Sequence, residues 1–174
     1  VIELLQENKI NSSDIKMIIH GTTLAANAVI ERKGAKTCFI TTEGFRDVLD
    51  IGYESRFDQY DILIEKTMSL VPRKHRYVIE ERTDINGSQI KPINTTQFKK
   101  LVEKIKSENF ESIGIGFLHS YANSENENIL KEFIFNNLPG VEVSISSEVC
   151  PEIREYERFT TTVINAYIKP LMSN

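Results

Sequence analysis

Apolar runs and amphipathic stretches alternate along most of the chain, which is the pattern of strands and helices in an α/β fold. The apolar runs predict four core strands, at residues 15–19, 35–42, 112–120 and 141–147. Their nearly continuous apolar character is typical of strands that are covered on both faces. Helices between consecutive strands imply right-handed crossovers, so the sequence predicts a parallel or mixed sheet with flanking helices.

Helical spacing of apolar residues and capping signals predict helices in the intervening segments. We expect them at residues 24–33, 43–51, 95–109, 124–138 and 151–168. Gly34 is expected to cap the first helix, and Pro151 and Pro170 are expected to mark the start and the end of the last. The last helix should bury one face, formed by Ile153, Tyr156, Val163, Ile164 and Tyr167.

Residues 76–93 interrupt this alternation with two extended runs. Asn86-Gly87 joins the two runs, and this dipeptide is the strongest short signal for a β-hairpin. We therefore expect an inserted β-hairpin, with residues 52–94 as a β insertion in the α/β domain. Residues 53–71 have mixed character and could form either a substrate-facing loop or a packing arm.

Composition and charge narrow the classes of function. The 174 residues include 25 acidic and 21 basic ones, a formal net charge of −4, and the two signs are interspersed. This balance offers no basic patch for nucleic acid or for an anionic membrane. Cys38 and Cys150 are far apart, which argues against a disulfide framework and favours the cytoplasm. No apolar run approaches the roughly 18 to 20 residues that span a bilayer.

Polar side chains follow each predicted core strand. In open α/β sheets, ligands bind beyond the carboxyl ends of the strands, because loops and helix N-termini meet there. The residues at these positions are His20–Thr23, Thr41–Glu43, His119–Ser120 and Ser146–Glu148. Gly21 allows close backbone approach, and Thr22 and Thr23 offer hydroxyl groups, so this turn is a candidate anion site. The alternative is an ordinary helix N-cap.

Two further groups of polar residues have both a functional and a structural interpretation. His119 could act as an acid, a base or a ligand, or it could be a buried imidazole bonded to the backbone. A polar stripe on the last helix could face a ligand or water, and it consists of Arg154, Arg158, Thr161, Thr162 and Asn165. The sequence has neither a G-x-x-x-x-G-K-[ST] phosphate loop nor a G-x-S-x-G nucleophile elbow, so spacing alone identifies no self-contained catalytic motif.

Residues 20–52, HGTTLAANAVIERKGAKTCFITTEGFRDVLDIG, resemble the hydantoinase A and 5-oxoprolinase family, whose members include ATP-dependent N-methylhydantoinase and acetone carboxylase subunits. The resemblance continues through LVPRKHRYVIEER, GFLHSYAN and SSEVCPEIREYERFTTTVINAYIKPL, so it covers essentially the whole chain. It implies a ribonuclease H-like fold of the actin, sugar kinase and heat-shock ATPase superfamily. On this basis residues 1–174 are expected to be part of an N-terminal domain, with an Asp-x-Gly-Gly-Thr phosphate-loop strand and a second lobe outside them.

The resemblance also implies an activity for the complete enzyme. ATP and Mg²⁺ would phosphorylate the amide oxygen of a small cyclic amide, such as hydantoin, N-methylhydantoin or 5-oxoproline, so that water can open the ring. Matching positions imply catalytic roles for His20 and Thr22, and cofactor contacts from Gly21, Thr22, Thr23 and Asn27. The residues expected to line or brace the substrate cleft are His119, Arg154, Glu155, Arg158 and Asn165.

Expected partners follow from the same resemblance. They are a companion hydantoinase B-type subunit or domain and further copies in an oligomer, whereas no nucleic acid, membrane or metal site within this chain is expected. The chain by itself is expected to be inactive. Two alternatives stay open, namely a subunit of an ATP-dependent ketone carboxylase of the acetone type and a non-catalytic binding domain on the same fold.

Overall fold

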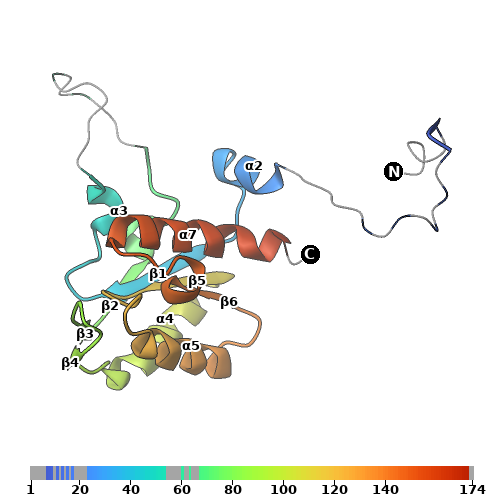
Figure 1. Cartoon of the computed structure of the whole chain (residues 1–174). Helices are drawn as coiled ribbons and strands as arrows, with labels where there is room; N and C mark the ends of the chain where they lie inside the picture. Colours follow the sequence, from blue (N-terminus) through green and yellow to red (C-terminus); the bar gives the residue numbers. More distant parts are fainter. Residues whose placement is uncertain are drawn as a thin grey trace.

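The computed structural model describes residues 7–9, 11, 13, 15, 17, 23–53, 60, 63 and 67–172. Within these ranges it confirms the predicted α/β class, with a parallel sheet, flanking helices and a small antiparallel pair (Figure 1). The turn His20–Thr22 and most of the predicted strand at residues 15–19 lie outside the described residues.

The described elements follow the predicted alternation of strand and helix. The parallel strands are β1 (Thr37–Thr42), β2 (Arg76–Ile79), β5 (Ser112–Gly116) and β6 (Glu142–Ile145). The antiparallel pair consists of β3 (Arg82–Thr83) and β4 (Gln89–Lys91). The helices are α2 (Leu24–Ile30), α3 (Val48–Ile51), α4 (Phe98–Ser107), α5 (Glu125–Asn137), α6 (Ser146–Val149) and α7 (Glu155–Met172), with 3-10 turns η2 (Arg73–His75) and η3 (Thr95–Gln97).

The main sheet has the order β2-β1-β5-β6, and each neighbouring pair is parallel. Helix α7 covers one face of this sheet, and α4 and α5 cover the other (Figure 1). This arrangement explains the continuous apolar runs. Consecutive side chains of a strand point to opposite faces of the sheet, and helices cover both faces. Cys38 and Ile40 pack on the α4 and α5 side, whereas Phe39 packs against Phe159 and Val163 of α7.

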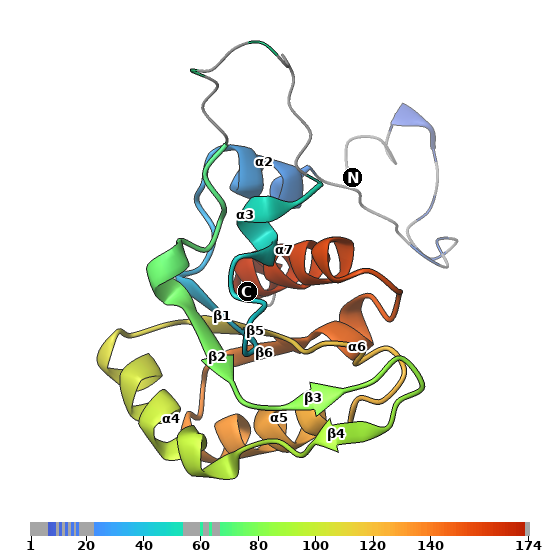
Figure 2. The same cartoon turned by 90° about the vertical axis from the view of Figure 1, so that its left-hand side faces the viewer.

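The antiparallel pair β3–β4 confirms the hairpin predicted at Asn86-Gly87. Gly87 has a φ of +84°, and the Asp84 carboxylate accepts hydrogen bonds of 2.8 Å from the backbone N–H groups of Asn86 and Ser88. The hairpin lies beside α5 (Figure 2). Two side-chain bonds hold it there, one from Asn123 Nδ2 to the Gly87 carbonyl oxygen, at 2.8 Å, and one between Gln89 and Glu125.

The first extended run has a different partner from the one predicted. Residues Arg76–Ile79 do not belong to the hairpin but form β2, which pairs in parallel with β1. The sequence predicts this run as a hairpin strand because Asn86-Gly87 follows it. Val78 is exposed while Tyr77 and Ile79 join the core, as expected for a strand at the edge of the sheet. The division of the chain at residues 52–94 stays a prediction, with β2 as part of the main sheet.

Arg76 explains how β2 is held at the edge of the sheet. Its guanidinium is buried and forms two bonds of 2.7 Å with the Asp50 carboxylate and one of 2.9 Å with the Val71 carbonyl oxygen. A bidentate pair of this kind is among the stronger polar contacts available to a protein. It ties the start of β2 to α3 and to the segment that precedes η2.

The predicted helix boundaries need three corrections. Gly34 is not a helix cap, because α2 ends at Ile30 and the left-handed residue is Arg32, with a φ of +54°. Instead, a β-carbon at Gly34 would lie 2.1 Å from the Tyr167 ring. The last helix begins at Glu155 rather than at Pro151, so Ile153 is exposed, not buried. Pro170 does not end that helix, because in the last turn its missing N–H removes only one bond.

Close packing of α7 on β5 leads to a prediction about two glycines on the same strand face. A β-carbon at Gly116 would lie 2.5 Å from Cδ1 of Phe159, whereas one at Gly114 would lie 3.2 Å from Cδ2 of Phe39. Because overpacking is destabilising, we expect Gly116→Ala to lower the free energy of unfolding by about 2 kcal/mol or more. Gly114→Ala should have a clearly smaller effect in the same urea titration. Equal losses for the two variants would contradict the packing shown here.

Candidate functional site

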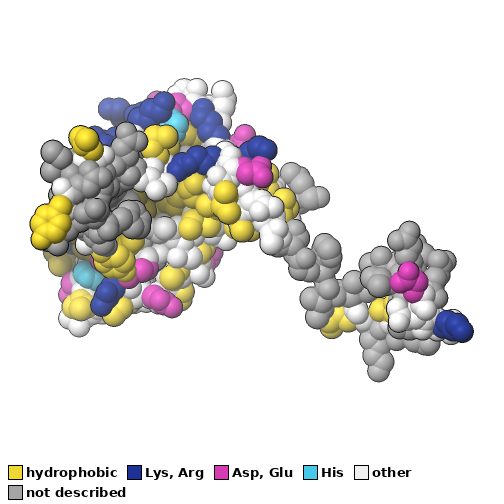
Figure 3. Space-filling model, turned by 90° about the horizontal axis from the view of Figure 1, so that it is seen from above, with side chains coloured by type: hydrophobic (Ala, Val, Ile, Leu, Met, Phe, Trp, Pro, Cys, Tyr) yellow, Lys and Arg dark blue, Asp and Glu magenta, His cyan; other side chains and the backbone are white. Residues whose placement is uncertain are grey.

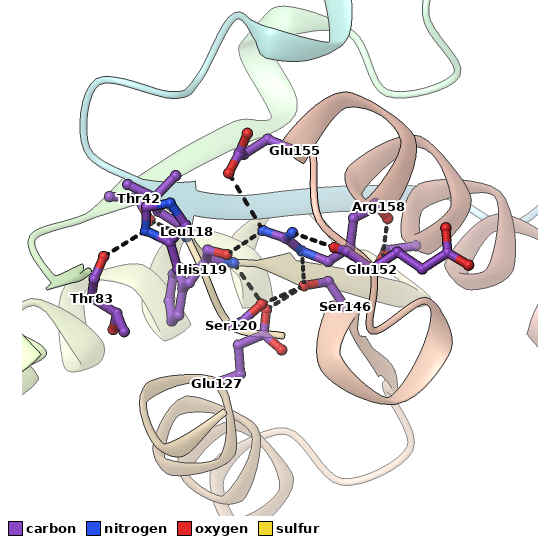
Figure 4. A network of polar contacts seen from close by, with 12 residues as sticks. Thr42, Thr83, Leu118, His119, Ser120, Glu127, Ser146, Glu152, Glu155 and Arg158 are labelled. Carbon is purple, nitrogen blue, oxygen red and sulfur yellow. Dashed lines mark hydrogen bonds and ion pairs between the residues drawn. The ribbon is translucent and has the colours of Figure 1, made fainter. Parts of the chain in front are cut away.

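The carboxyl ends of the four parallel strands meet at one edge of the sheet, and a set of buried polar residues gathers there (Figure 4). We call this set the carboxyl-edge network. It comprises Thr42, Glu81, His119, Ser120, Asn126, Glu127, Ser146, Ser147 and Arg158. The position is the one at which open α/β sheets bind ligands.

Glu127 lies at the centre of the network. Its side chain is fully buried in the first turn of α5 and accepts four hydrogen bonds. The donors are the backbone N–H groups of Phe117 and Ser147, both at 2.9 Å, and the hydroxyl groups of Ser146 and Ser147, at 2.6 and 2.7 Å. A buried carboxylate is tolerated only when its oxygens are satisfied in this way. Glu127 therefore fixes the turns after β5 and β6 relative to each other.

Arg158 supplies the opposite charge from α7, and it too is fully buried. It donates to the carbonyl oxygens of Phe117, at 2.9 Å, and Glu152, at 2.8 Å, and to Ser146 Oγ, at 3.2 Å. A carboxylate oxygen of Glu155 lies 4.0 Å away. Burial lowers the pKa of Arg158, while Glu155 and Glu127 oppose that effect. The guanidinium thus connects the start of α7 to the ends of β5 and β6.

Glu81 forms the second buried carboxylate of the network. It accepts hydrogen bonds from the Thr42 hydroxyl and from Asn126 Nδ2, and Thr42 Oγ1 in turn accepts from the backbone N–H of Leu118, at 2.9 Å. Burial raises the pKa of Glu81 above its ordinary value, although both hydrogen bonds oppose the shift. Asn126 Oδ1 is buried and has no hydrogen-bond partner among the described atoms. This group links β1, the segment after β2 and α5.

His119 is the partly exposed member of the network, just beyond β5. Its backbone has a φ of +53°, and its Nδ1 lies 2.8 Å from the carbonyl oxygen of Thr83 in β3. The His119 ring also contacts the Tyr121 ring edge to face, with centroids 5.9 Å apart. The Arg158 guanidinium lies over the same Tyr121 ring, 5.4 Å from its centroid. The structural interpretation of His119, a bond to backbone, is thus observed.

The structure distributes the other predicted site residues over several places. His20, Gly21 and Thr22 lie outside the described residues. Thr23 and Asn27 are both exposed at the start of α2 and are 3.4 Å apart from Oγ1 to Nδ2. Among the described residues, no hydrogen bond joins either of them to the carboxyl-edge network. Their cofactor role stays a prediction from the sequence.

On α7 and the segment before it, the polar stripe has two kinds of members. Arg154 is exposed, with a φ of +77°, and Glu155 is partly exposed beside Arg158. In contrast, Arg158 and Thr162 are fully buried, and Asn165 donates a 2.9 Å hydrogen bond to Ser144 Oγ on β6. Arg158 and Asn165 use their side chains to hold α7 on the sheet, so they can brace a cleft without facing into it.

Sequence reasoning missed Glu81, Asn126 and Glu127 as members of the site. A signal was available for two of them. Glu127 lies on the same helical face as Leu130 and Ile134, and Glu81 continues the buried alternation of Tyr77 and Ile79. A carboxylate on an apolar face is rarely buried unless it is paired, so it marks a polar network inside the fold.

Other classes of site are not found in the described part of the molecule. Among these residues, no group of three or more His, Cys, Asp or Glu side chains could hold a metal ion. None of the described helices is long and apolar enough to cross a membrane. Acidic and basic side chains occur together on the face seen in Figure 3, which agrees with the interspersed charges of the sequence.

Comparison with known proteins gives the class of the fold and then the family. The crystal structure of the ATP-dependent caprolactamase from Pseudomonas jessenii matches 99% of the chain, with a TM-score of 0.88 and 31% identity. A nucleotide-free acetone carboxylase structure matches 86% of it, with a TM-score of 0.75 and 26% identity. Residues 1–138 match the hydantoinase/oxoprolinase N-terminal region. The chain belongs to the hydantoinase/oxoprolinase family, as its resemblance implied.

Two curated relatives show how much of such a protein the chain represents. An uncharacterized protein of Methanocaldococcus jannaschii is 43% identical over 99% of the chain, which corresponds to 26% of that protein. The caprolactamase subunit alpha of Pseudomonas jessenii is 34% identical over 92% of the chain and 23% of its own length. The chain therefore spans about a quarter of the length of these relatives.

The four hydrogen bonds to Glu127 predict that this residue is essential for stability. In Glu127→Gln, an amide NH₂ group replaces one carboxylate oxygen. This NH₂ group would face a hydrogen-bond donor of the protein, so a buried hydrogen bond is lost and two donors repel each other. We expect the free energy of unfolding to fall by about 3 kcal/mol. The matched change Glu132→Gln, at an exposed position of the same helix, should cost less than about 0.5 kcal/mol in the same urea titration. Similar values for both variants would exclude this role for Glu127.

The raised pKa of Glu81 predicts a pH-dependent effect of Glu81→Gln. The folded state holds this proton to a higher pH than the unfolded state, so wild-type stability falls as the pH rises from about 4.5 through the folded pKa. Glu81→Gln has no carboxyl group to ionise, so its stability does not fall in this pH range. If the Asn126 amide flips, its unpaired Oδ1 can accept a hydrogen bond from the new glutamine amide. We expect Glu81→Gln to gain stability relative to wild type between pH 4 and pH 7. If urea titrations give the same difference in unfolding free energy between the variant and wild type at pH 4 and at pH 7, the raised pKa of Glu81 is refuted.

Proposed function

We propose that this chain is part of the N-terminal region of an ATP-dependent enzyme that opens a small cyclic amide ring. The observation that supports this most directly is the similarity to an ATP-dependent caprolactamase over 99% of the chain, at 31% identity and a TM-score of 0.88. A likeness of that extent covers the whole sheet, the carboxyl-edge network and α7 together. In the proposed reaction, ATP phosphorylates the amide oxygen, and water then opens the activated ring.

Apart from Thr23 and Asn27, the described residues would contribute a scaffold to this reaction rather than the nucleotide site. They include no cluster suited to a metal ion, and the buried carboxylates of Glu81 and Glu127 are already bonded within the protein. They therefore do not fit a Mg²⁺ site, and no step of the proposal uses one here. In this proposal His20, Gly21, Thr22, Thr23 and Asn27 contact the phosphates or the ring. The carboxyl-edge network holds the loops that would face them.

A ketone carboxylase subunit is the second candidate function. Its support is the acetone carboxylase structure, which shares the fold over 86% of the chain at 26% identity. The caprolactamase match is better in coverage, identity and TM-score, so the cyclic amide is favoured. Both alternatives would involve further protein. The name of one relative, caprolactamase subunit alpha, supports a companion subunit. We expect an oligomer that contains several copies of both subunits.

Ring-stimulated ATP hydrolysis tests the proposal. The complete protein that contains this chain, with its companion subunit where there is one, would be assayed with hydantoin, N-methylhydantoin, 5-oxoproline and ε-caprolactam. We expect one ring to stimulate ATP hydrolysis and to be opened in a stoichiometric amount. His20→Ala and Thr22→Ala should lower this rate by about 100-fold, the typical cost of one lost polar contact to a transition state.

His75→Ala is a suitable control, because His75 precedes β2 at the opposite, amino end of the parallel strands and contacts Glu108. It should leave the stimulated rate within about twofold of wild type. ATP hydrolysis that depends on a ketone and bicarbonate, with no response to any ring, would favour the carboxylase. No response to either class of substrate would favour a non-catalytic binding domain.

A further inference from the structure

The bond between His119 and Thr83 determines which nitrogen of the imidazole carries the proton. The Thr83 oxygen is a backbone carbonyl and can only accept, so Nδ1, at 2.8 Å, must donate. In the neutral ring, Nε2 then carries a lone pair and can only accept. Thr83 is buried, and the Tyr121 ring packs edge to face on the imidazole, so both the tautomer and the orientation of the ring are fixed. The structure shows no hydrogen bond to Nε2 from the described residues.

The backbone at His119 determines where its side chain lies. A φ of +53° is uncommon for a residue other than glycine, although asparagine, aspartate and histidine adopt it more often than other side chains. The turn is well determined, because the His119 carbonyl oxygen accepts from the N–H of Ala122 at 2.9 Å. This conformation places the His119 side chain beyond the carboxyl end of a central strand, where open α/β sheets bind ligands.

Four carboxylates on the elements around this edge of the sheet already have partners within the protein. Glu81 and Glu127 are buried within the network, and Glu80 is bonded to Lys91 and Asn94. Glu155 faces the Arg158 guanidinium. Nε2 of His119 is an oriented acceptor at the partly exposed end of the network, and none of these carboxylates takes its place.

We infer that His119 Nε2 accepts a hydrogen bond from the ring N–H of the cyclic amide, which makes His119 a residue that determines substrate specificity. The inference rests on the proposed function. Phosphate oxygens of a nucleotide only accept hydrogen bonds, so they do not match a lone pair on Nε2. The nitrogen of an unsubstituted cyclic amide bond carries an N–H donor beside the carbonyl oxygen, and this donor matches the lone pair. Rings with a substituent on that nitrogen lose this contact.

His119→Asn separates this role from a structural one. The asparagine amide can still donate to the Thr83 carbonyl oxygen from the position of Nδ1, and asparagine is well tolerated at positive φ. The variant should therefore fold, which thermal unfolding would check. It has no acceptor at the position of Nε2. His119→Gln, in contrast, can place its amide oxygen near that position and should restore part of the contact.

The experiment uses the complete protein and the ring that stimulates its ATP hydrolysis, together with the same ring methylated on the nitrogen of the amide bond that is opened. Competition gives the affinity of each compound for wild type and for each variant. We expect the preference for the N–H ring over the N-methyl ring to fall about tenfold in His119→Asn. His119→Gln should keep more of that preference, and His75→Asn, the same change at the other end of the sheet, should keep all of it.

The two proposals fail in different ways. A wild-type preference for the N–H ring that persists in His119→Asn would overturn the inference about His119 and leave ring opening intact. An equal loss in His119→Asn and His119→Gln would also overturn it, because the acceptor atom would then be irrelevant. Absence of ring-stimulated ATP hydrolysis in the wild-type protein would overturn the proposed function, and the inference about His119 with it.

Discussion

The rest of the structure depends on the buried pairing of Glu127 and Arg158 through Ser146 and the backbone of Phe117. The carboxylate binds the two N–H groups of the turns after β5 and β6, and the guanidinium binds the carbonyl oxygen of Phe117. Both side chains are fully buried, so neither could exist there without the other polar groups of the network. One interaction thus holds α5, α7 and the carboxyl ends of two central strands in a single arrangement.

This arrangement explains why the apolar core alone does not define the site. The larger cluster under α4 and α5 and the smaller one under α7 position the layers, but apolar contacts are not directional. Hydrogen bonds to a buried charge have a defined geometry and a high cost when broken. The turn that carries His119 is therefore set more sharply by Glu127 and Thr83 than by the surrounding apolar side chains.

The sequence predicts much of the fold because its information is local. Continuous apolar runs identified β1, β5 and β6, and Asn86-Gly87 identified the hairpin turn. It failed where pairing depends on distant residues. The sequence places β2 in the hairpin because nothing near Arg76 reveals its contact with Asp50, 26 positions away. Gly34 was read as a cap because its neighbour Tyr167 is invisible to local spacing.

The candidate site was predictable to a smaller extent for the same reason. The position of His119 after a central strand could be read from the sequence, but its tautomer depends on Thr83, 36 positions away. Likewise, Arg158 belonged to a plausible polar stripe, yet burial on β5 and β6 directs it into the protein. A polar residue at a strand end is thus a weak indicator of ligand contact until its partners are known. Of the two, His119 keeps an unused lone pair at the sheet edge, and for that reason it is the one that can recognise a substrate.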